Sequence, residues 1–274
     1  MKHLIPAFLA LLTLQAGAQN VKLNSGGDWK VPVKDGVLEL KGRMRKITSE
    51  QLQKVDPAAR YTLTWEARGS VPEEAGKYMI GFSVYDKDGQ EIQPYHVYYT
   101  PGSETVLTED APKGGRTLKI RDGSKWKSGA MYCPAFHVKA DGGDIPNRDV
   151  LTGGIEKVTA GDGYTELTLK RPLAKDYPAG TAVRQHLYQS SLYLKVADIP
   201  AEWKKESAAL SGISKGTVRY GQWWPGTEYF RVMITGNIGS RNADAESCRR
   251  RRAAGGGELQ VAGRCRWRGG RVGN

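Results

Sequence analysis

Apolar and polar side chains alternate strictly in two neighbouring segments of this chain. Every second residue is aromatic or aliphatic, and the residues between them are mainly small, polar or charged. The residues that share the apolar face are Tyr61, Leu63, Trp65 and Ala67 in the first segment, and Tyr78, Ile80, Phe82 and Val84 in the second. A period of two that is rich in aromatic residues is typical of half-buried antiparallel strands. The pattern therefore predicts a β-sandwich whose core these two strands help to build.

The rest of the chain continues as strands separated by turn residues. Residues 86–89 (DKDG) predict a hairpin turn, and residues 91–100 predict the returning strand. Short strand signals with frequent turns fill residues 114–186, and strong strands resume over residues 187–237. No long helical period appears. We therefore expect an all-β chain in which a small β-barrel-like unit is inserted into an antiparallel sandwich.

The expected domain boundaries follow from these changes in strand strength and turn frequency. The sandwich is discontinuous and takes residues 19–113 and 187–240, and the inserted unit takes residues 114–186. Residues 1–18 have a basic start, an apolar run and the small-residue pattern Ala-Gly-Ala, which together indicate a secretory signal peptide. This predicts a secreted, cell-surface or periplasmic protein, and no other apolar run reaches the length of a membrane-spanning helix.

Charge is distributed unevenly along the chain. The net charge is +12, but half of it lies in residues 241–274, which carry nine Arg, no Lys and three acids. The body is only mildly basic, which argues against a nucleic-acid partner. Two interpretations of the tail remain open: an Arg-rich arm for a polyanion, or the product of a shifted reading frame. Under either interpretation the tail is expected to be disordered, because it has few apolar side chains to bury.

Four stretches resemble a known family of sugar-binding domains. They read QKVDPAARYTLTWEARG, GFSVYDKDGQEI, IPAEWKKESAALSG and YFRVMITGN, in that order along the chain. Together they resemble carbohydrate-binding modules of the galactose-binding-like, jelly-roll type, over about half of the chain. The middle block is similar to small β inserts of secreted and phage-like proteins.

The resemblance implies a jelly-roll sandwich that binds a polysaccharide or another glycan. Such modules usually close with an acidic strand near a structural calcium ion. Here the Arg-rich tail stands in place of that strand, so a structural calcium ion is possible by resemblance but unsupported by the residues, and no other cofactor is expected. The family shares no single binding motif, so no ligand-binding residue is carried over.

Aromatic residues outside the predicted core are the candidate ligand contacts. Sugar binding needs flat apolar faces for pyranose C–H groups, with polar groups around them. Trp223 and Trp224 are adjacent, so in an extended chain one is expected to face solvent. The other candidates are Tyr85, Tyr95 and Tyr98. The alternative is that these rings only cover the faces of sheets.

Catalytic and metal-binding patterns are weak. Carboxylates that could form a hydrolytic pair by residue type alone are Glu66, Glu73, Glu74, Asp86, Asp88 and Glu91. Asp86 and Asp88 resemble the start of a calcium loop, but no Glu follows at the required spacing, so a hairpin turn is favoured. The four histidines are scattered, and Cys133 in a strand-like run is expected to be a buried apolar residue. We predict no catalytic residue and no metal ligand.

Three functions remain open at this point. The first is a non-catalytic carbohydrate-binding or cell-surface recognition module that serves a polysaccharide-processing system. The second is a fragment of a glycoside hydrolase or lyase, and the third is a structural surface or adhesion protein. A non-catalytic binding module is favoured because the resemblance and the secretion signal both point to it.

Overall fold

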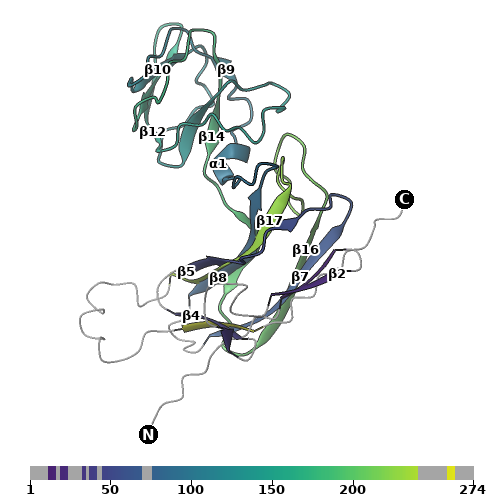
Figure 1. The fold of residues 1–274 in the computed structure, drawn as a ribbon. Coiled ribbons are helices and arrows are strands. Elements are labelled where there is room, and N and C mark those ends of the chain that lie inside the picture. The colour runs from purple at the N-terminus through teal and green to yellow at the C-terminus, as the bar shows by residue number, and fades with distance from the viewer. Residues whose placement is uncertain are drawn as a thin grey trace, which may run out of the picture.

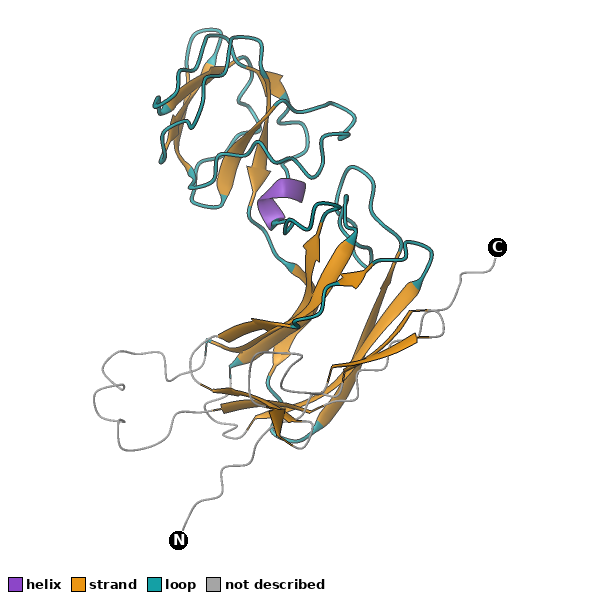
Figure 2. Cartoon of the chain, viewed as in Figure 1, coloured by secondary structure: helices purple, strands orange, loops and turns teal. Residues whose placement is uncertain are grey.

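The protein consists of two connected lobes, a larger β-sandwich and a smaller all-β unit (Figure 1). A computed structural model describes residues 12–16, 19–23, 33–34, 37–41, 45–69, 76–239 and 258–262, with side chains for residues 38–40, 46–69 and 76–239. Nearly all regular structure is antiparallel strand, and one short helix lies where the lobes meet (Figure 2). The prediction of an all-β, jelly-roll-like sandwich is confirmed.

Two antiparallel sheets form the sandwich, and the order of strands in each differs from their order in the sequence. The strands of the first sheet are, in spatial order, β15 (Leu192–Asp198), β8 (Lys77–Tyr85), β17 (Tyr229–Ile238) and β5 (Arg45–Thr48), and β6 (Gln53–Lys54) also pairs with β17. The strands of the second are β16 (Lys204–Ser211), β7 (Arg60–Gly69), β18 (Glu258–Ala262), β4 (Val37–Lys41) and β3 (Val33–Lys34). Strands that are distant in sequence are therefore neighbours, and β15 and β16 each form one edge of a sheet.

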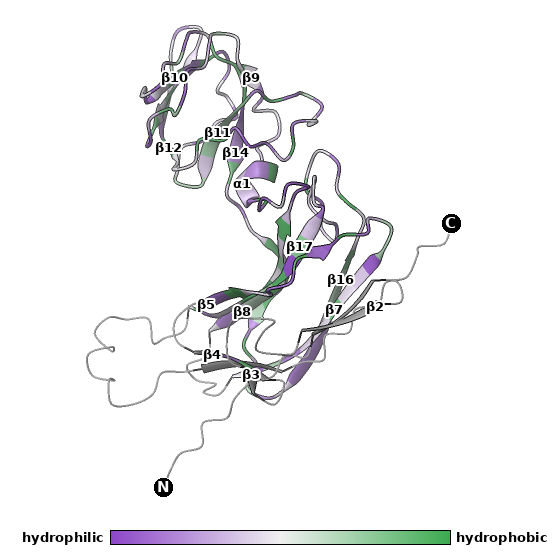
Figure 3. Cartoon of the chain, viewed as in Figure 1, coloured by the Kyte–Doolittle hydropathy of each residue, from purple (hydrophilic) through white to green (hydrophobic). Residues whose placement is uncertain are grey.

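The sandwich core follows the alternation in β7 and β8. The alternating apolar residues that were predicted to share one face, Tyr61 to Ala67 and Tyr78 to Val84, are at most 2% exposed. Trp65 donates a hydrogen bond to the hydroxyl of Tyr78 at 3.2 Å, which joins the two inner faces across the core. Apolar residues mark β8 and β17 in green in Figure 3. The sequence pattern thus predicted correctly which side chains face inward.

The smaller unit contains two three-stranded sheets with a separate core. One sheet has the order β10 (Thr117–Ile120), β13 (Thr165–Leu169), β12 (Ile155–Ala160), and the other has β11 (Tyr132–Phe136), β14 (Ala182–Leu187), β9 (Thr105–Val106). The buried residues of this unit form a cluster distinct from that of the sandwich. Because β9 pairs with β14, the unit reaches back beyond the boundary expected at residue 114.

The predicted strand over residues 91–100 is wrong. Its centre forms helix α1 (Pro94–Val97), with Pro94 in the first turn. Proline has no N–H to donate to a sheet ladder, and its fixed φ angle suits the first turn of a helix. The His96 side chain accepts a hydrogen bond from the backbone N–H of Gln93 at 3.1 Å, which secures this turn.

Most residues of the two predicted terminal segments lie outside the described part of the chain. Of the expected signal peptide, Leu12–Ala16 is described and forms β1, which pairs with β2 (Gln19–Leu23). Of the tail, Glu258–Ala262 is described and forms β18 between β4 and β7, where disorder was expected. The sequence ELQVA alternates polar and apolar residues, so it can join a sheet even though its surroundings in the tail lack such a pattern.

Cys133 in β11 is buried, as its apolar surroundings in the sequence predicted. Burial raises the pKa of its thiol to about 12, because the interior disfavours the thiolate. Since the thiolate is the reactive form, we expect iodoacetamide to leave Cys133 unmodified at pH 8 and to label it in guanidinium chloride. Peptide mass spectrometry reports labelling at each cysteine separately. Rapid modification of Cys133 in the native protein would contradict the burial.

Candidate ligand-binding groove

A groove of about 560 Å³ opens between the edge strands of the two sheets. Its walls come from β15 and β16, which end their respective sheets on the same side of the sandwich. The segment before β15 and the loop after β16 line the rest of it. Gly81 allows the first wall to sit close to its sheet, because a Cβ there would lie 2.1 Å from the backbone oxygen of Leu192. Backbone packing thus fixes the start of β15.

The groove is lined by aromatic, polar and aliphatic side chains. The aromatic residues are Tyr98, Tyr193, Tyr220 and Trp224. The polar and charged residues are Ser190, Ser191, Ser207, Gln222, Lys195 and Arg219, and the larger aliphatic residues are Leu192, Leu194, Leu210 and Val218. This volume and this mixture fall within the range of small-molecule sites in proteins.

Two of the five predicted aromatics meet at this groove. The rings of Tyr98 and Trp224 contact each other edge to face, with centroids 5.6 Å apart. Tyr98 is half-buried, and burial raises the pKa of its hydroxyl, so at neutral pH it is a phenol that can donate a hydrogen bond. Trp224 is 1% exposed and packs beneath the groove. Tyr98 is therefore a ligand candidate, and Trp224 supports it.

The prediction that one of the two adjacent tryptophans faces solvent is wrong. Trp223 is fully buried, and its ring lies 5.2, 4.9 and 4.8 Å from those of Tyr61, Phe82 and Phe230. Alternation places neighbouring residues on opposite faces of an extended chain, but it does not show that either face is exposed to solvent. Here the chain turns after Trp224, whose carbonyl accepts from the N–H of Thr227, and both indoles enter the core.

The other two predicted aromatics lie elsewhere. Tyr95 belongs to α1, and its ring contacts those of His96 and Tyr188 at 4.7 and 6.2 Å. Tyr85 lies on the outer face of β8 and lines a smaller depression of about 260 Å³, where the guanidinium of Arg231 sits 5.8 Å from its ring. Neither lines the groove. The structure therefore does not bring the five candidates together.

The groove also contains an aromatic residue that sequence reasoning missed. Tyr220 is 95% exposed, although it lies in a loop with a regular set of backbone hydrogen bonds. In that loop Ser211 donates to Gly221, and Trp223 donates to Gly212, both at 2.9 Å. An exposed ring on an ordered loop beside a groove is available to a ligand. The glycines that flank the loop at 212, 216 and 221 were the signal that could have revealed it.

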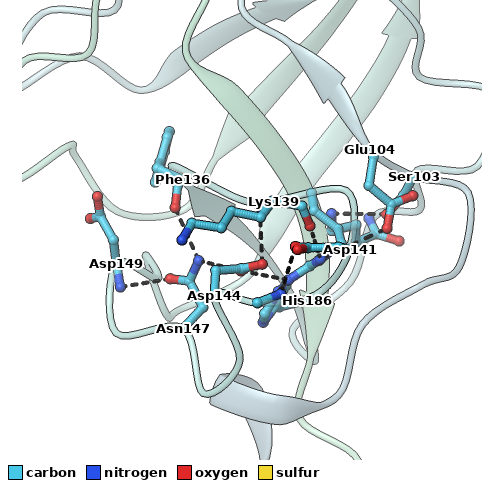
Figure 4. Close-up of polar contacts among 12 residues, drawn as sticks. Ser103, Glu104, Phe136, Lys139, Asp141, Asp144, Asn147, Asp149 and His186 are labelled. Atoms are coloured by element: carbon cyan, nitrogen blue, oxygen red, sulfur yellow. Dashed lines mark hydrogen bonds and ion pairs between the residues drawn. The ribbon is translucent and has the colours of Figure 1, made fainter. Parts of the chain in front are cut away.

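A buried polar network lies in the smaller unit, at its junction with the sandwich (Figure 4). The side chain of Arg184 on β14 is 1% exposed and pairs with the carboxylate of Asp144 at 2.7 Å. Arg184 also donates to Nε2 of His186 at 3.0–3.1 Å. Asp144 accepts further hydrogen bonds from the backbone N–H of Lys139 and the side chain of Asn147 at 3.0 and 2.9 Å. The buried charges are thus paired and hydrogen-bonded.

These hydrogen bonds decide the charge of Asp144. Burial raises its pKa, but the hydrogen bonds from Asn147 and Lys139 and the charge of Arg184 outweigh burial and hold that pKa below its usual value. Asp144 therefore remains ionised at neutral pH. Such a network stabilises the junction while all its members are present.

The same region connects the two lobes through two neutral histidines. Nδ1 of His186 donates to the carbonyl of Tyr95 in α1 at 2.7 Å, since its other ring nitrogen accepts from Arg184. His96 accepts from the guanidinium of Arg148 at 3.0 Å through Nδ1, and its carbonyl accepts from the N–H of Asn147 at 2.9 Å. Burial and, to a lesser degree, the charge of the nearby arginine lower the pKa of each histidine to about 4.

Two further carboxylates form hydrogen bonds and ion pairs that stabilise loops. Asp149 accepts from His137, Tyr177 and Lys175 at 2.7–2.9 Å at the end of β11, and it does not line the groove. Asp86 caps the hairpin turn by accepting from the N–H groups of Asp88 and Gln90, and it pairs with Arg148. The hairpin turn predicted over residues 86–89 is confirmed.

The described residues contain no group of three or more His, Cys, Asp or Glu that could hold a metal ion. Within the same residues, no helix is long and apolar enough to cross a membrane. No protein-family model, curated protein or solved structure matches the chain.

Proposed function

We propose that this protein is a secreted, non-catalytic carbohydrate-binding module that acts at the cell surface or in the periplasm, beside a polysaccharide-processing system. The glycan lies in the groove between β15 and β16. The observation that carries the proposal is the groove itself, where exposed and half-buried tyrosines stand beside serine hydroxyls and the Gln222 amide.

The lining of the groove suits a sugar for two reasons. Aromatic rings offer flat apolar faces to the C–H groups of a pyranose, and Tyr220 extends such a ring into solvent. Hydroxyl and amide groups can both donate and accept, which matches sugar hydroxyls that do the same. The strands β15 and β16 are paired in sheets, so ligand binding would order little additional backbone there.

The lining favours binding over hydrolysis. A glycoside hydrolase of the usual kind needs two carboxylates roughly 5–10 Å apart on either side of the scissile bond. No Asp, Glu or His is among the described residues that line the groove. The groove therefore offers stacking and hydrogen bonding without an acid–base pair.

Replacing Tyr220 with alanine is expected to weaken glycan binding about five- to tenfold, because an aromatic contact contributes about 1 kcal/mol beyond its buried area. Tyr220 is 95% exposed, so the variant should fold normally. Affinity electrophoresis across a panel of polysaccharides measures the retardation of the variant and the parent on each glycan.

Tyr164→Ala is the matched control, because Tyr164 lies in the smaller unit and does not line the groove. It should bind like the parent. Absence of retardation on every polysaccharide would count against glycan binding and favour a structural surface protein. Retardation that Tyr220→Ala leaves unchanged would place the glycan elsewhere on the molecule.

A further inference from the structure

We infer that the groove selects an acidic glycan, in which carboxylate groups are carried on the sugar rings, as in a polyuronate. This inference rests on the proposed function, because it names the class of glycan for the same groove. Two cationic side chains, Lys195 and Arg219, line the groove, and none of the described lining residues is acidic. The described lining therefore carries a net positive charge, which favours an anionic ligand.

Arg219 is placed for direct recognition. It is exposed, it adjoins Tyr220, and it makes no ion pair with any residue that the structure describes. Its backbone N–H donates to Oγ of Ser214 at 3.1 Å, and its carbonyl accepts from the N–H of Gln222 at 3.3 Å. The loop thus holds the backbone of Arg219 in place, while its guanidinium is free to bind a carboxylate through two parallel hydrogen bonds.

Lys195 adds a second positive charge on the wall of β15. Its ammonium group lies 3.1 Å from the carboxylate of Glu206 on β16, and the same carboxylate pairs with Lys204 at 2.8 Å. Two ammonium groups therefore share one carboxylate, which leaves one positive charge uncompensated within this cluster. This ion pair also links the two walls of the groove.

The order of side chains along the loop matches a uronic acid better than a simple anion. Tyr220 supplies a ring for the face of a pyranose, and Arg219 beside it supplies the partner for a carboxylate on that sugar. A small carboxylate anion would bind the guanidinium of Arg219 without contacting the ring of Tyr220. A neutral sugar would stack on Tyr220 and offer no carboxylate to Arg219. A sugar ring that carries a carboxylate uses both.

The experiment compares two polymers that differ only in the carboxylate. The full chain is titrated with polygalacturonate and with carboxyl-reduced polygalacturonate, using affinity electrophoresis at about 50 mM and 300 mM salt. We expect at least about tenfold tighter binding to the acidic polymer at low salt, with a smaller preference at high salt. Alginate extends the test to a second polyuronate, and dextran sulfate tests whether sulfate replaces the carboxylate.

Arg219→Gln is the decisive variant, and it should reduce the preference for the acidic polymer about tenfold while its binding to the reduced polymer stays unchanged. Lys113→Gln removes the same charge from an exposed position in the smaller unit and should behave like the parent. Equal affinity for both polymers would overturn this inference and leave glycan binding standing. Binding of no glycan would overturn both.

Tighter binding to dextran sulfate than to either polyuronate would overturn the assignment to carboxylates. Equal behaviour of Arg219→Gln and Lys113→Gln would overturn the role of Arg219.

Discussion

Acidification from pH 6.5 to pH 4 is expected to lower the free energy of unfolding by up to roughly 3 kcal/mol through His186 alone. His186 has a pKa of about 4 in the folded protein, against an ordinary value of 6.5, because burial disfavours its cation. In this pH window the unfolded chain binds a proton that the folded chain excludes. Stability due to this residue is therefore complete above pH 6.5 and is lost as the pH falls toward 4.

His96 contributes in the same direction, because burial also lowers its pKa to about 4. Asp86, Asp144 and Asp149 titrate in a different window, because hydrogen bonds and neighbouring cations hold the pKa of each below its ordinary value in the folded state. The stability that these carboxylates provide is lost only below about pH 4.

Urea unfolding at a series of pH values measures this dependence. The variant His186→Gln should be less stable than the parent at pH 7 and should show a flatter profile between pH 6.5 and 4. His137→Gln is the control, because His137 is an exposed histidine outside the junction. A parent profile that stays level between pH 6.5 and 4 would show that the two junction histidines are not held neutral.

Replacing Asp144 with alanine is expected to reduce the free energy of unfolding by about 3–5 kcal/mol, because the buried Arg184 cation loses its closest carboxylate and keeps that of Glu104 at 3.9 Å. The side chains of Arg184 and Asp144 are only 1% and 7% exposed, so solvent screens the remaining charge poorly. The backbone N–H of Lys139 and the amide of Asn147 would lose their acceptor in the same step.

Asp198→Ala is the matched control, because Asp198 forms an exposed pair with Lys77 at 2.9 Å. An exposed pair contributes about 1 kcal/mol or less. A double variant, Arg184→Met with Asp144→Leu, should lose less stability than Asp144→Ala alone, since it removes both buried charges. Chemical denaturation of the parent and the three variants measures the free energy of unfolding of each. Equal losses for Asp144→Ala and Asp198→Ala would show that the buried pair contributes no more to stability than a surface pair.

The strands of the sandwich could be predicted because their sequences alternate. In β7 and β8 the inward residues of the alternating set are apolar and mostly large, so a shift of one residue would expose the whole set. The two cores were harder to separate from sequence, because β9 has only two residues and precedes the expected insert. A strand of two residues carries no measurable period.

The candidate site was only partly predictable, for reasons that lie in tertiary structure. Its walls come from segments near residues 190–195, 207–210 and 218–224, and only the closure of the two sheets brings them together. Tyr98 was identified by its aromatic neighbours, although the predicted strand around it is helix α1 followed by a single β-bridge at Tyr99. Trp223 was misassigned because alternation says nothing of a chain that turns back into the core.

Chemical-shift mapping tests the central proposal most directly. The amide signals of the isotope-labelled protein are followed during titration with an oligosaccharide of the best-retained polysaccharide. The account predicts that the largest shifts fall in residues 190–195, 207–210 and 218–222, the three segments that line the groove. Saturable shifts confined to the smaller unit, or the absence of shifts with every glycan, would contradict it.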